Sequence, residues 1–470
     1  MTHPEDRHPR PAILVAATHS GAGKTTVTST ILRALRRRGL VTQPFKIGPD
    51  FIDTAYHTES ARRTAINLDL WMMGEDGIRQ SFTTHSASAD LSVIEAMGAL
   101  FDGTEHGSAA HLAKLLSVPV LLVLDVWGMT RTTDAVLDGM LGFDPGLDIA
   151  GVILNRVGSH THAQMVLDAL SPPNRALVLG YLPHRTGLHV PERHLGLLTP
   201  EENPTSEADR DLAHKAAEST LDLDRLLTIA ARRTTPTTSA EPTRAEPAPT
   251  PPTPTRRARL AIARDQAFCF YYEDNLRTLH DAGFDLVPFS PLADTALPAD
   301  IDAIYLGGGY PESFAADLAA NTHLATALRH RAAAHLPIYA ECGGLIYLAR
   351  TLTGFDGHTH PMSGVLPIDI AMDPQHLSIA YVDARTQITT PLGPAGTRLR
   401  GQEFHQSRIV ADDTHTPPLY ELTTSHGTTS QAGVAAGSVV ASYVHAHLAS
   451  NPHIAHNLLQ ASLTARHQGP

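Results

Sequence analysis

Cys342 is followed by two glycines and lies between an apolar run, 336–339, and a helix-compatible run, 346–350. This order predicts a short buried strand, a sharp turn at the cysteine and a helix. A thiol at the start of a helix is favoured as thiolate, because the first N–H groups are unpaired and the helix dipole is positive there. Gly343 allows the backbone to turn tightly and to aim an N–H at a developing oxyanion. The pattern indicates a cysteine nucleophile, and the alternative is a buried, inert cysteine.

A base for this thiol is expected near the end of the chain. His445 and His447 follow an apolar run and are two residues apart. On a strand they share one face, so the spacing does not choose between them, and a strand histidine is also commonly structural. A triple glycine, 307–309, follows another apolar run. Gly308 and Gly309 are expected to permit close backbone approach and to provide a second oxyanion donor for the cysteine.

A second set of chemical residues lies near the beginning of the chain. The apolar run 12–17 precedes the sequence THSGAGKTT at 18–26, and a helix-compatible segment follows. Strand, glycine-rich loop and helix form a phosphate cradle, to which Lys24 adds a positive charge and Thr25 a hydroxyl for Mg²⁺. Thr18 replaces the first glycine of the usual spacing, so this is a variant P-loop; a glycine-rich turn without a ligand is the alternative. The predicted ATP-binding residues are Ser20, Gly21, Gly23, Lys24, Thr25 and Thr26.

Acidic residues follow the next two predicted strands. The segment 43–53 carries Lys46, Asp50 and Asp53, near enough in sequence to meet one Mg²⁺–phosphate group. Aspartate in a Gly-Pro loop is also a common turn former. Glu95 ends a further apolar run in the position expected of a second acid beside the metal, with a solvated loop acid as the alternative. The predicted metal ligands are Thr25, Asp50, Asp53 and Glu95.

The elements that must position these residues alternate between apolar runs and helix-compatible segments. Such alternation predicts a parallel sheet with ligands at the carboxyl ends of its strands. Asp125 and Asn155 end two of the runs and are expected at that edge, together with the polar segment 188–197. Residues 234–255 hold seven prolines and eight threonines without hydrophobic periodicity, which predicts an extended linker. A new series of apolar runs begins at residue 259.

Length and composition exclude several classes of protein. A chain of 470 residues is expected to form two or three domains. Its two cysteines rule out a disulfide framework and suit a reducing cytosol. The polar stretch 1–11 lacks the apolar region of a signal peptide, and the apolar run 118–124 is too short to cross a bilayer. A net charge of −12 argues against nucleic-acid and membrane partners. We expect a cytoplasmic protein that binds small molecules, and a homodimer is compatible with the sequence.

Together the motifs resemble those of the a,c-diamide synthases of the cobalamin pathway, which act on cobyrinate or hydrogenobyrinate. The resemblance runs nearly end to end, excepting the termini and the linker. The similar blocks are 18–26, 45–53, 67–69, 100–103 and 191–197 in the first half, and 263–272, 307–312, 339–344 and 442–445 in the second.

The resemblance implies an α/β protein of two domains. It implies a P-loop amide-synthase domain of the dethiobiotin-synthetase type at 1–232, a Pro/Thr-rich linker at 233–257, and a flavodoxin-like class I glutamine amidotransferase domain at 258–470. It further implies that Cys342 is the nucleophile and that His445, rather than the second histidine, is its base.

The expected reaction is ATP- and glutamine-dependent amidation of the a and c acetate groups of a corrin-ring polycarboxylate, through an acyl phosphate and ammonia from L-glutamine. Mg²⁺–ATP and substrate chemistry is implied for Asp50, Asp53 and Glu95, with Lys46 beside the substrate. One loop and one residue depart from the family's usual pattern. The loop 96–99 reads AMGA where the family usually has GVMG, and Gln402 replaces a histidine. His447 stands where most class I glutaminases have glutamate, as the family resemblance leads us to expect.

Three alternatives stay open. Cobyric acid synthase, an amide ligase for other corrin positions, usually carries SDAGKS in its P-loop, whereas this chain has SGAGKT at 20–25. A nickel-sirohydrochlorin diamide synthase is compatible with every motif. A nucleotide-switch protein of the partitioning-ATPase kind, with an inert C-terminal module, is disfavoured by the presence of both Cys342 and His445.

Overall fold

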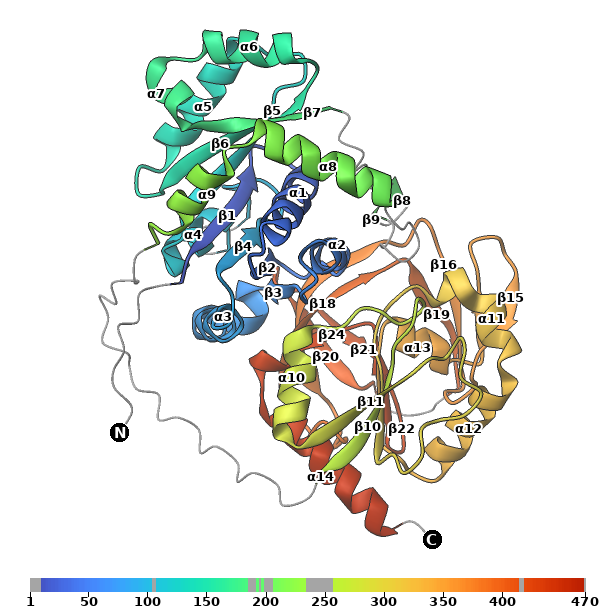
Figure 1. Cartoon of the computed structure of the whole chain (residues 1–470). Coiled ribbons are helices and arrows are strands. Elements are labelled where there is room, and N and C mark those ends of the chain that lie inside the picture. Colours follow the sequence, from blue (N-terminus) through green and yellow to red (C-terminus); the bar gives the residue numbers. More distant parts are fainter. Residues whose placement is uncertain are drawn as a thin grey trace, which may run out of the picture. The chain divides into compact units, whose positions relative to one another are not determined.

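The computed structural model describes residues 10–103, 107–184, 192–193, 196–197, 206–233, 257–413 and 418–468. They form two compact units, one within Met1–Leu70 and Gly74–Pro247 and the other within Trp71–Met73 and Ala248–Pro470 (Figure 1). The boundary between the units falls among residues 234–256, which lie outside the described part of the chain. The domain limits and the linker proposed from the sequence therefore stay predictions, and most of the segment 188–197 also lies outside the described residues.

The N-terminal unit is built on a seven-stranded sheet with the order β3-β2-β4-β1-β5-β6-β7. Every pairing in it is parallel. Strands covered on both faces are expected to be continuously apolar, and β1 and β4 are buried along their whole length. The strands are β1 Ala12–Ala17, β2 Thr42–Ile47, β3 Ile66–Leu68, β4 Leu91–Glu95, β5 Val120–Asp125, β6 Ile149–Val157 and β7 Val178–Pro183. A separate hairpin pairs β8 Glu192–Arg193 with β9 Gly196–Leu197.

Helices connect these strands, as the alternating pattern predicts. The first, α1, buries Val27, Ile31 and Leu35 against the sheet, and all three side chains are fully buried. It ends at Arg37, and Gly39 follows with a φ of 84°, a backbone conformation that favours glycine. The helices are α1 Lys24–Arg37, α2 Ile52–Ala61, α3 Leu70–Ser86, α4 Ala109–Leu116, α5 Thr132–Phe143, α6 His160–Ala169, α7 Pro172–Leu177, α8 Glu207–Thr220 and α9 Leu223–Ala230.

The C-terminal unit has a central six-stranded sheet with the order β11-β10-β12-β13-β23-β22. The pairings from β11 to β23 are parallel, and β22 is antiparallel to β23. Its strands are β10 Ala258–Ala263, β11 Phe284–Phe289, β12 Ala303–Leu306, β13 Ile338–Glu341, β22 Val434–Ala436 and β23 Val439–Ser442. The helices of this unit are α10 Glu273–Ala282, α11 Ala315–Ala320, α12 Thr322–Ala333, α13 Gly343–Leu348 and α14 His453–Gln468, with 3₁₀ turns at Pro311–Phe314 (η1) and Leu448–Ser450 (η2).

Two further sheets accompany it, and the sequence analysis anticipated neither. One has four strands, in the order β15 Thr359–Pro361, β14 Thr351–Thr353, β16 Ile368–Met372 and β19 Ser407–Asp412. The other has five, in the order β21 Thr429–Ala432, β20 Tyr420–Thr424, β17 Ser378–Thr386, β18 Arg398–His405 and β24 His445–His447. The chain therefore leaves the central sheet after β23 and joins the five-stranded sheet at β24.

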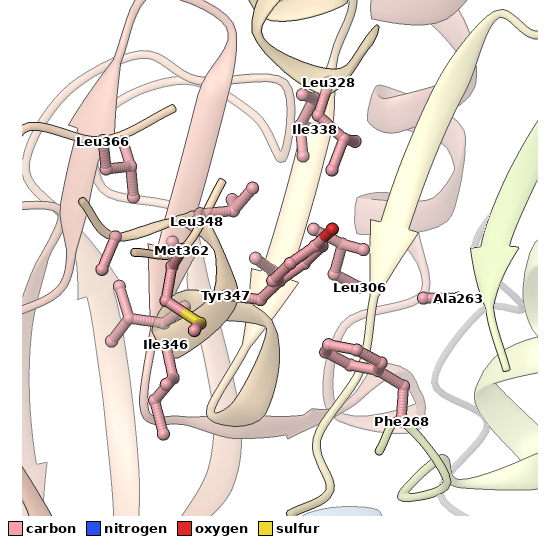
Figure 2. Close-up of a cluster of buried hydrophobic side chains, with 14 of the residues drawn as sticks. Ala263, Phe268, Leu306, Leu328, Ile338, Ile346, Tyr347, Leu348, Met362 and Leu366 are labelled. Atoms are coloured by element: carbon pink, nitrogen blue, oxygen red, sulfur yellow. The ribbon is translucent and has the colours of Figure 1, made fainter. Parts of the chain in front are cut away.

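The helix that follows Cys342 rests on one of the apolar clusters of the C-terminal unit. Tyr347 of α13 lies beside Leu306, and its ring centroid is 5.5 Å from that of Phe268 (Figure 2). Ile346 and Leu348 belong to the same buried cluster. Because α13 is only six residues long, this packing rather than helix length must hold it in place.

Candidate active sites

The predicted phosphate loop follows β1 and leads into α1. Gly21 and Gly23 have φ angles of 80° and 89°, which favour glycine. A Cβ atom on Gly23 would lie 2.2 Å from Nδ2 of Asn155, so no larger residue fits there. Lys24 begins the helix and is buried, and burial lowers its pKa, while Ser20 is exposed. The loop thus has the conformation and the positive charge that a phosphate cradle requires.

Two strand ends brace this loop from the side. Asn155 donates from Nδ2 to the carbonyl oxygen of Ala22 at 2.8 Å. The guanidinium of Arg156 donates to the carbonyl oxygen of Gly21 at 2.7 Å and to Oδ2 of Asp125 at 2.6 Å. Asp125 and Asn155 were predicted at this edge of the sheet, and the structure places both there. The contacts of Arg156 could not be predicted from the sequence, because nothing in its type or spacing distinguishes it from a surface arginine.

A buried cluster of charged side chains lies beside the loop. Nζ of Lys46 is 2.5 Å from Oδ2 of Asp53 and 2.7 Å from Oε1 of Glu95. The hydroxyl of Thr25 donates to the same two carboxylates, at 3.2 Å and 3.1 Å. Residues from β2, α2, β4 and α1 therefore meet at one point, as the predicted magnesium and substrate site requires. The ammonium of Lys46 bridges the two carboxylates.

His57 also belongs to this charged cluster, although it was not predicted from the sequence. Its Nε2 lies 2.8 Å from Oε2 of Glu95, and its Nδ1 lies 3.5 Å from Oγ of Ser29. The side chain is fully buried. Asp53 and His57 are four residues apart on α2, a spacing that puts both on one face of the helix. That spacing was the available signal.

The two carboxylates of the cluster differ in their electrostatics. Burial raises the pKa of Asp53 to about 7, helped by the charge of Asp50 and opposed by Lys46. Burial acts in the same direction on Glu95, but the charges of Lys46 and His57 and their hydrogen bonds outweigh it and lower its pKa. Glu95 is therefore held as a carboxylate.

Asp50 lies at the start of α2 and serves there as a cap. Its Oδ1 accepts the N–H groups of Ile52 and Asp53 at 2.8 Å and 2.9 Å. Its carbonyl oxygen accepts Nδ2 of Asn67 at 2.9 Å. These bonds match the turn-former alternative, and a direct role of Asp50 toward metal or substrate stays a prediction.

The turn at Cys342 is strained and tightly packed. Its φ of 46° and ψ of −98° are unusual for a residue with a side chain, at a cost of about 1–3 kcal/mol. The N–H of Cys342 donates to the carbonyl oxygen of Ser442 at 2.7 Å, and the N–H of Gly344 donates to that of Gly307 at 3.0 Å. A Cβ atom on Gly344 would lie 2.3 Å from the carbonyl oxygen of Leu306. Strand, turn and helix follow the order predicted from the sequence.

The resting state of the thiol differs from the expectation. Burial, followed by the charge of Glu312, raises the pKa of Cys342, and a hydrogen bond from the N–H of Gly343 opposes this. The short α13 supplies too small a dipole to offset the desolvation of a thiolate. Burial at this turn therefore favours the thiol of Cys342 over the thiolate that the sequence analysis expected.

The glycine loop after β12 lies between the histidine and the cysteine turn. A Cβ atom on Gly308 would lie 2.2 Å from Cε1 of His445, and one on Gly343 would lie 3.0 Å from the nitrogen of Gly309. Gly309 has a φ of 154°, and a Cβ atom there would lie 2.0 Å from the carbonyl oxygen of Ala267. The structure therefore brings His445 and the three predicted oxyanion-loop glycines together. The N–H of Gly308 itself donates to the carbonyl oxygen of Phe270 at 3.3 Å.

The two histidines of β24 have different surroundings. His445 is buried against the glycine loop, and burial, followed by His405, lowers its pKa to about 3. The Nδ1 of His447 accepts the N–H of Ala449 at 3.3 Å and caps the turn η2. The ring of His447 packs on Tyr272, with centroids 5.0 Å apart. His447 therefore contacts the turn η2, whereas His445 lies against the glycine loop, and the role of His445 as the base stays a prediction.

The polar residues 401–407 form the end of β18 and the start of β19. The ring of His405 stacks on Tyr443 with centroids 3.7 Å apart, and Ser407 donates to the hydroxyl of that tyrosine at 3.0 Å. Burial raises the pKa of Glu403 to about 7, and its charge acts on Cys342. The polar residues at the end of β18 form a strand because they pair with β24, which carries His445.

No helix among the described residues is long and apolar enough to cross a membrane. The same residues contain no group of three or more His, Cys, Asp and Glu side chains that could hold a metal ion by themselves.

Comparisons with known proteins find a different domain family in each half of the chain. Residues 13–198 match the model of the CobQ/CobB/MinD/ParA nucleotide binding domain, and residues 259–453 match that of the CobB/CobQ-like glutamine amidotransferase domain. These two domains in one chain define a glutamine-dependent ligase, and the nucleotide-binding domain implies the use of ATP.

Similarity to individual proteins extends over nearly the whole chain. The chain is 42% identical to a cobyrinate a,c-diamide synthase of Syntrophotalea carbinolica, over 94% of this chain and 96% of that protein. It is 38% identical to one of Leptospira interrogans and 39% identical to one of Salmonella typhimurium, in each case over 96% of this chain and 98% of that protein. The chain therefore belongs to the cobyrinate a,c-diamide synthase family, as the resemblance of its motifs implied.

Proposed function

We propose that the protein converts the a and c acetate carboxylates of cobyrinate or hydrogenobyrinate to amides, with ATP and glutamine as co-substrates. The observation that carries this proposal is that one chain holds two sites. One is a braced phosphate loop with a buried Lys46–Asp53–Glu95 cluster, and the other is a glycine loop, 307–309, that lies against both the Cys342–Gly343 turn and His445. The first set suits activation of a carboxylate, and the second suits release of ammonia from glutamine.

In the N-terminal unit the loop residues bind the phosphates of ATP, and Lys24 offsets the charge on the transferring group. The hydroxyl of Thr25 lies within hydrogen-bond distance of the carboxylates of both Asp53 and Glu95, and oxygen ligands of these kinds fit Mg²⁺. When bound, Mg²⁺ would neutralise phosphate charge. Lys46 and Asp53 would bind the substrate carboxylate, and Asp50 holds the start of α2 in place.

In the C-terminal unit Cys342 gives its proton to the neutral imidazole of His445 as sulfur attacks the side-chain amide of glutamine. The N–H groups of Gly309 and Gly343 stabilise the oxyanion. The C–N bond then breaks, His445 returns the proton to the departing ammonia, and water hydrolyses the thioester. Ammonia displaces phosphate from the acyl phosphate and gives the amide.

The identity of the ring is tested by mass spectrometry of the products. Cobyrinate, hydrogenobyrinate and nickel-sirohydrochlorin are offered separately with glutamine, ATP and Mg²⁺. Two successive mass losses of one unit, each an OH replaced by NH₂, on either corrin acid support the proposal. Turnover of the nickel compound alone would contradict it. A cytoplasmic location, the absence of nucleic-acid and membrane partners, and a homodimer belong to the same proposal.

A further inference from the structure

A buried carboxylate directly precedes the cysteine, and the reaction as described above does not use it. Glu341 is the last residue of β13 and is 2% exposed. Its Oε1 accepts the hydroxyl of Tyr339 at 2.5 Å and the N–H of Ala446 at 3.0 Å. Its Oε2 accepts the hydroxyl of Tyr305 at 2.8 Å. Both oxygens are therefore used, and one of the donors is the backbone of the histidine strand.

That strand needs an anchor to the central sheet. β24 has three residues and pairs with β18 of the five-stranded sheet, whereas β13 pairs with β12 and β23. Ala446 lies next to His445, so the bond from its N–H to Glu341 joins the histidine strand to the strand that ends at Cys342. A buried hydrogen bond to a carboxylate is among the stronger hydrogen bonds in proteins.

The same carboxylate also connects to the glycine loop. Tyr305, which donates to it, stacks on Tyr339 with ring centroids 5.1 Å apart and meets Tyr271 edge-on at 5.1 Å. The hydroxyl of Tyr271 accepts the N–H of Gly307 at 2.8 Å. One buried group is thereby linked to the cysteine turn, the histidine strand and the loop between them.

We propose that Glu341 is a positioning residue for the splitting of glutamine: it holds the N–H of Ala446 and so sets the imidazole of His445 against the glycine loop. The inference rests on the proposed roles of Cys342 and His445. Burial raises the pKa of Glu341 to about 7, although the hydrogen bonds from Tyr339, Tyr305 and Ala446 lower it. Burying a carboxylate in the interior of a sheet costs desolvation free energy, which an apolar side chain at this position would avoid. We therefore expect Glu341 to have a role that an apolar side chain cannot perform.

The test compares Glu341→Met with Glu341→Gln. Methionine fills the space without an acceptor, so kcat for glutamine hydrolysis should fall by roughly 10–100-fold with KM changed less than about twofold, because the base is displaced while the glutamine pocket remains. In the Glu341→Gln variant, the side-chain amide oxygen at position 341 can still accept the N–H of Ala446. The side-chain NH₂ group at that position can donate to the hydroxyl of Tyr305. Glu341→Gln should therefore stay within about threefold of wild type. Amidation with free ammonia should be unchanged in both.

Asp302→Asn is the matched control, because Asp302 is also buried and accepts a backbone N–H, that of Arg259 at 2.8 Å, away from the cysteine. It should keep the wild-type kcat. Unchanged hydrolysis by Glu341→Met, or an equal loss in both Glu341 variants, would overturn the inference. If Glu341→Met does not fold, Tyr339→Phe is measured in its place, because it removes one hydrogen-bond donor to Glu341 and leaves the bond from Ala446 intact. A tenfold loss of kcat for glutamine hydrolysis in Tyr339→Phe would also overturn the inference. A Cys342→Ala protein that still used glutamine would instead contradict the proposed function itself.

Discussion

The imidazole of His445 lies so close to Gly308 that a Cβ atom on the glycine would be 2.2 Å from Cε1 of the ring. The absence of a side chain at Gly308 therefore defines the place of the proposed base. The close approach also explains why a glycine run, rather than any other tight turn, follows β12.

Gly308→Ala should displace the imidazole and lower kcat for glutamine hydrolysis by about 100-fold, a typical contribution of a well-placed base. Amidation with ammonium chloride at alkaline pH should be unaffected. The control is Gly142→Ala in α5, where a Cβ atom meets nothing within 4 Å. A Gly308→Ala protein with normal glutaminase kinetics would show that the ring has room to move.

Cys342→Ala should end glutamine-dependent synthesis and leave ammonia-dependent synthesis intact, because the thiol only splits glutamine. His445→Ala should lower glutaminase activity by about 10²–10⁴-fold, since the raised pKa of the thiol leaves little thiolate without a base. His447→Ala should be milder. Both activities are measured on the same preparations, and equal losses for the two histidine variants would contradict the assignment.

Lys46→Met should destabilise the N-terminal unit by about 3–5 kcal/mol, because it leaves two buried carboxylates without their ammonium. Urea unfolding measures the loss. Mg²⁺ should restore part of it if Asp53 and Glu95 are metal ligands, and a chelator should reverse the gain. Lys114→Met, which breaks an exposed ion pair with Asp144, should change stability by less than about 1 kcal/mol.

Arg156→Met should raise KM for ATP by roughly 5–30-fold, because the phosphate loop loses its bond at the carbonyl of Gly21. Glutamine hydrolysis should not change. Arg175→Met, which removes a surface ion pair with Asp168 in the same unit, provides the comparison. Equal KM values for ATP in the two variants would mean that the hydrogen bond from Arg156 to Gly21 does not set the conformation of the phosphate loop.

The pH dependence of stability should reveal the buried histidines. Burial lowers the pKa of His447 from 6.5 to about 4, so between these values the unfolded chain binds a proton that the folded chain does not. Stability should therefore fall as the pH falls through this window. His447→Asn keeps an acceptor for Ala449 without titrating, and its unfolding free energy should depend less on pH by about 1.4 kcal/mol per pH unit. Urea unfolding of the C-terminal unit from pH 6.5 to 4.5 checks this; parallel curves would contradict it.

Local patterns carried most of the fold prediction. The phosphate loop and the cysteine turn are each set by consecutive residues, so their strands, glycines and helices could be recognised directly. The cluster of Lys46, Asp53 and Glu95 was accessible too, because parallel strands end at a common edge. His57 belongs to the same cluster but comes from the middle of a helix, where no strand end indicates it.

The polar network of the C-terminal unit was less accessible. His445 and His447 were expected on a strand after an apolar run, but the chain changes sheets between Ser442 and His445. A change of sheet depends on the partner strand, β18, whose polar residues resemble a loop when taken alone. The role of Glu341 has the same origin, since its partner Ala446 is a backbone group more than a hundred residues away in the sequence.

The change of sheet between β23 and β24 has a kinetic consequence. Because β24 is short and belongs to the five-stranded sheet, opening of that sheet would withdraw His445 while the cysteine turn stays folded. Amide hydrogen exchange should then show β24 and β18 exchanging together, and faster than β13. Because His445 is the proposed base for Cys342, glutamine could not be split while the five-stranded sheet is open.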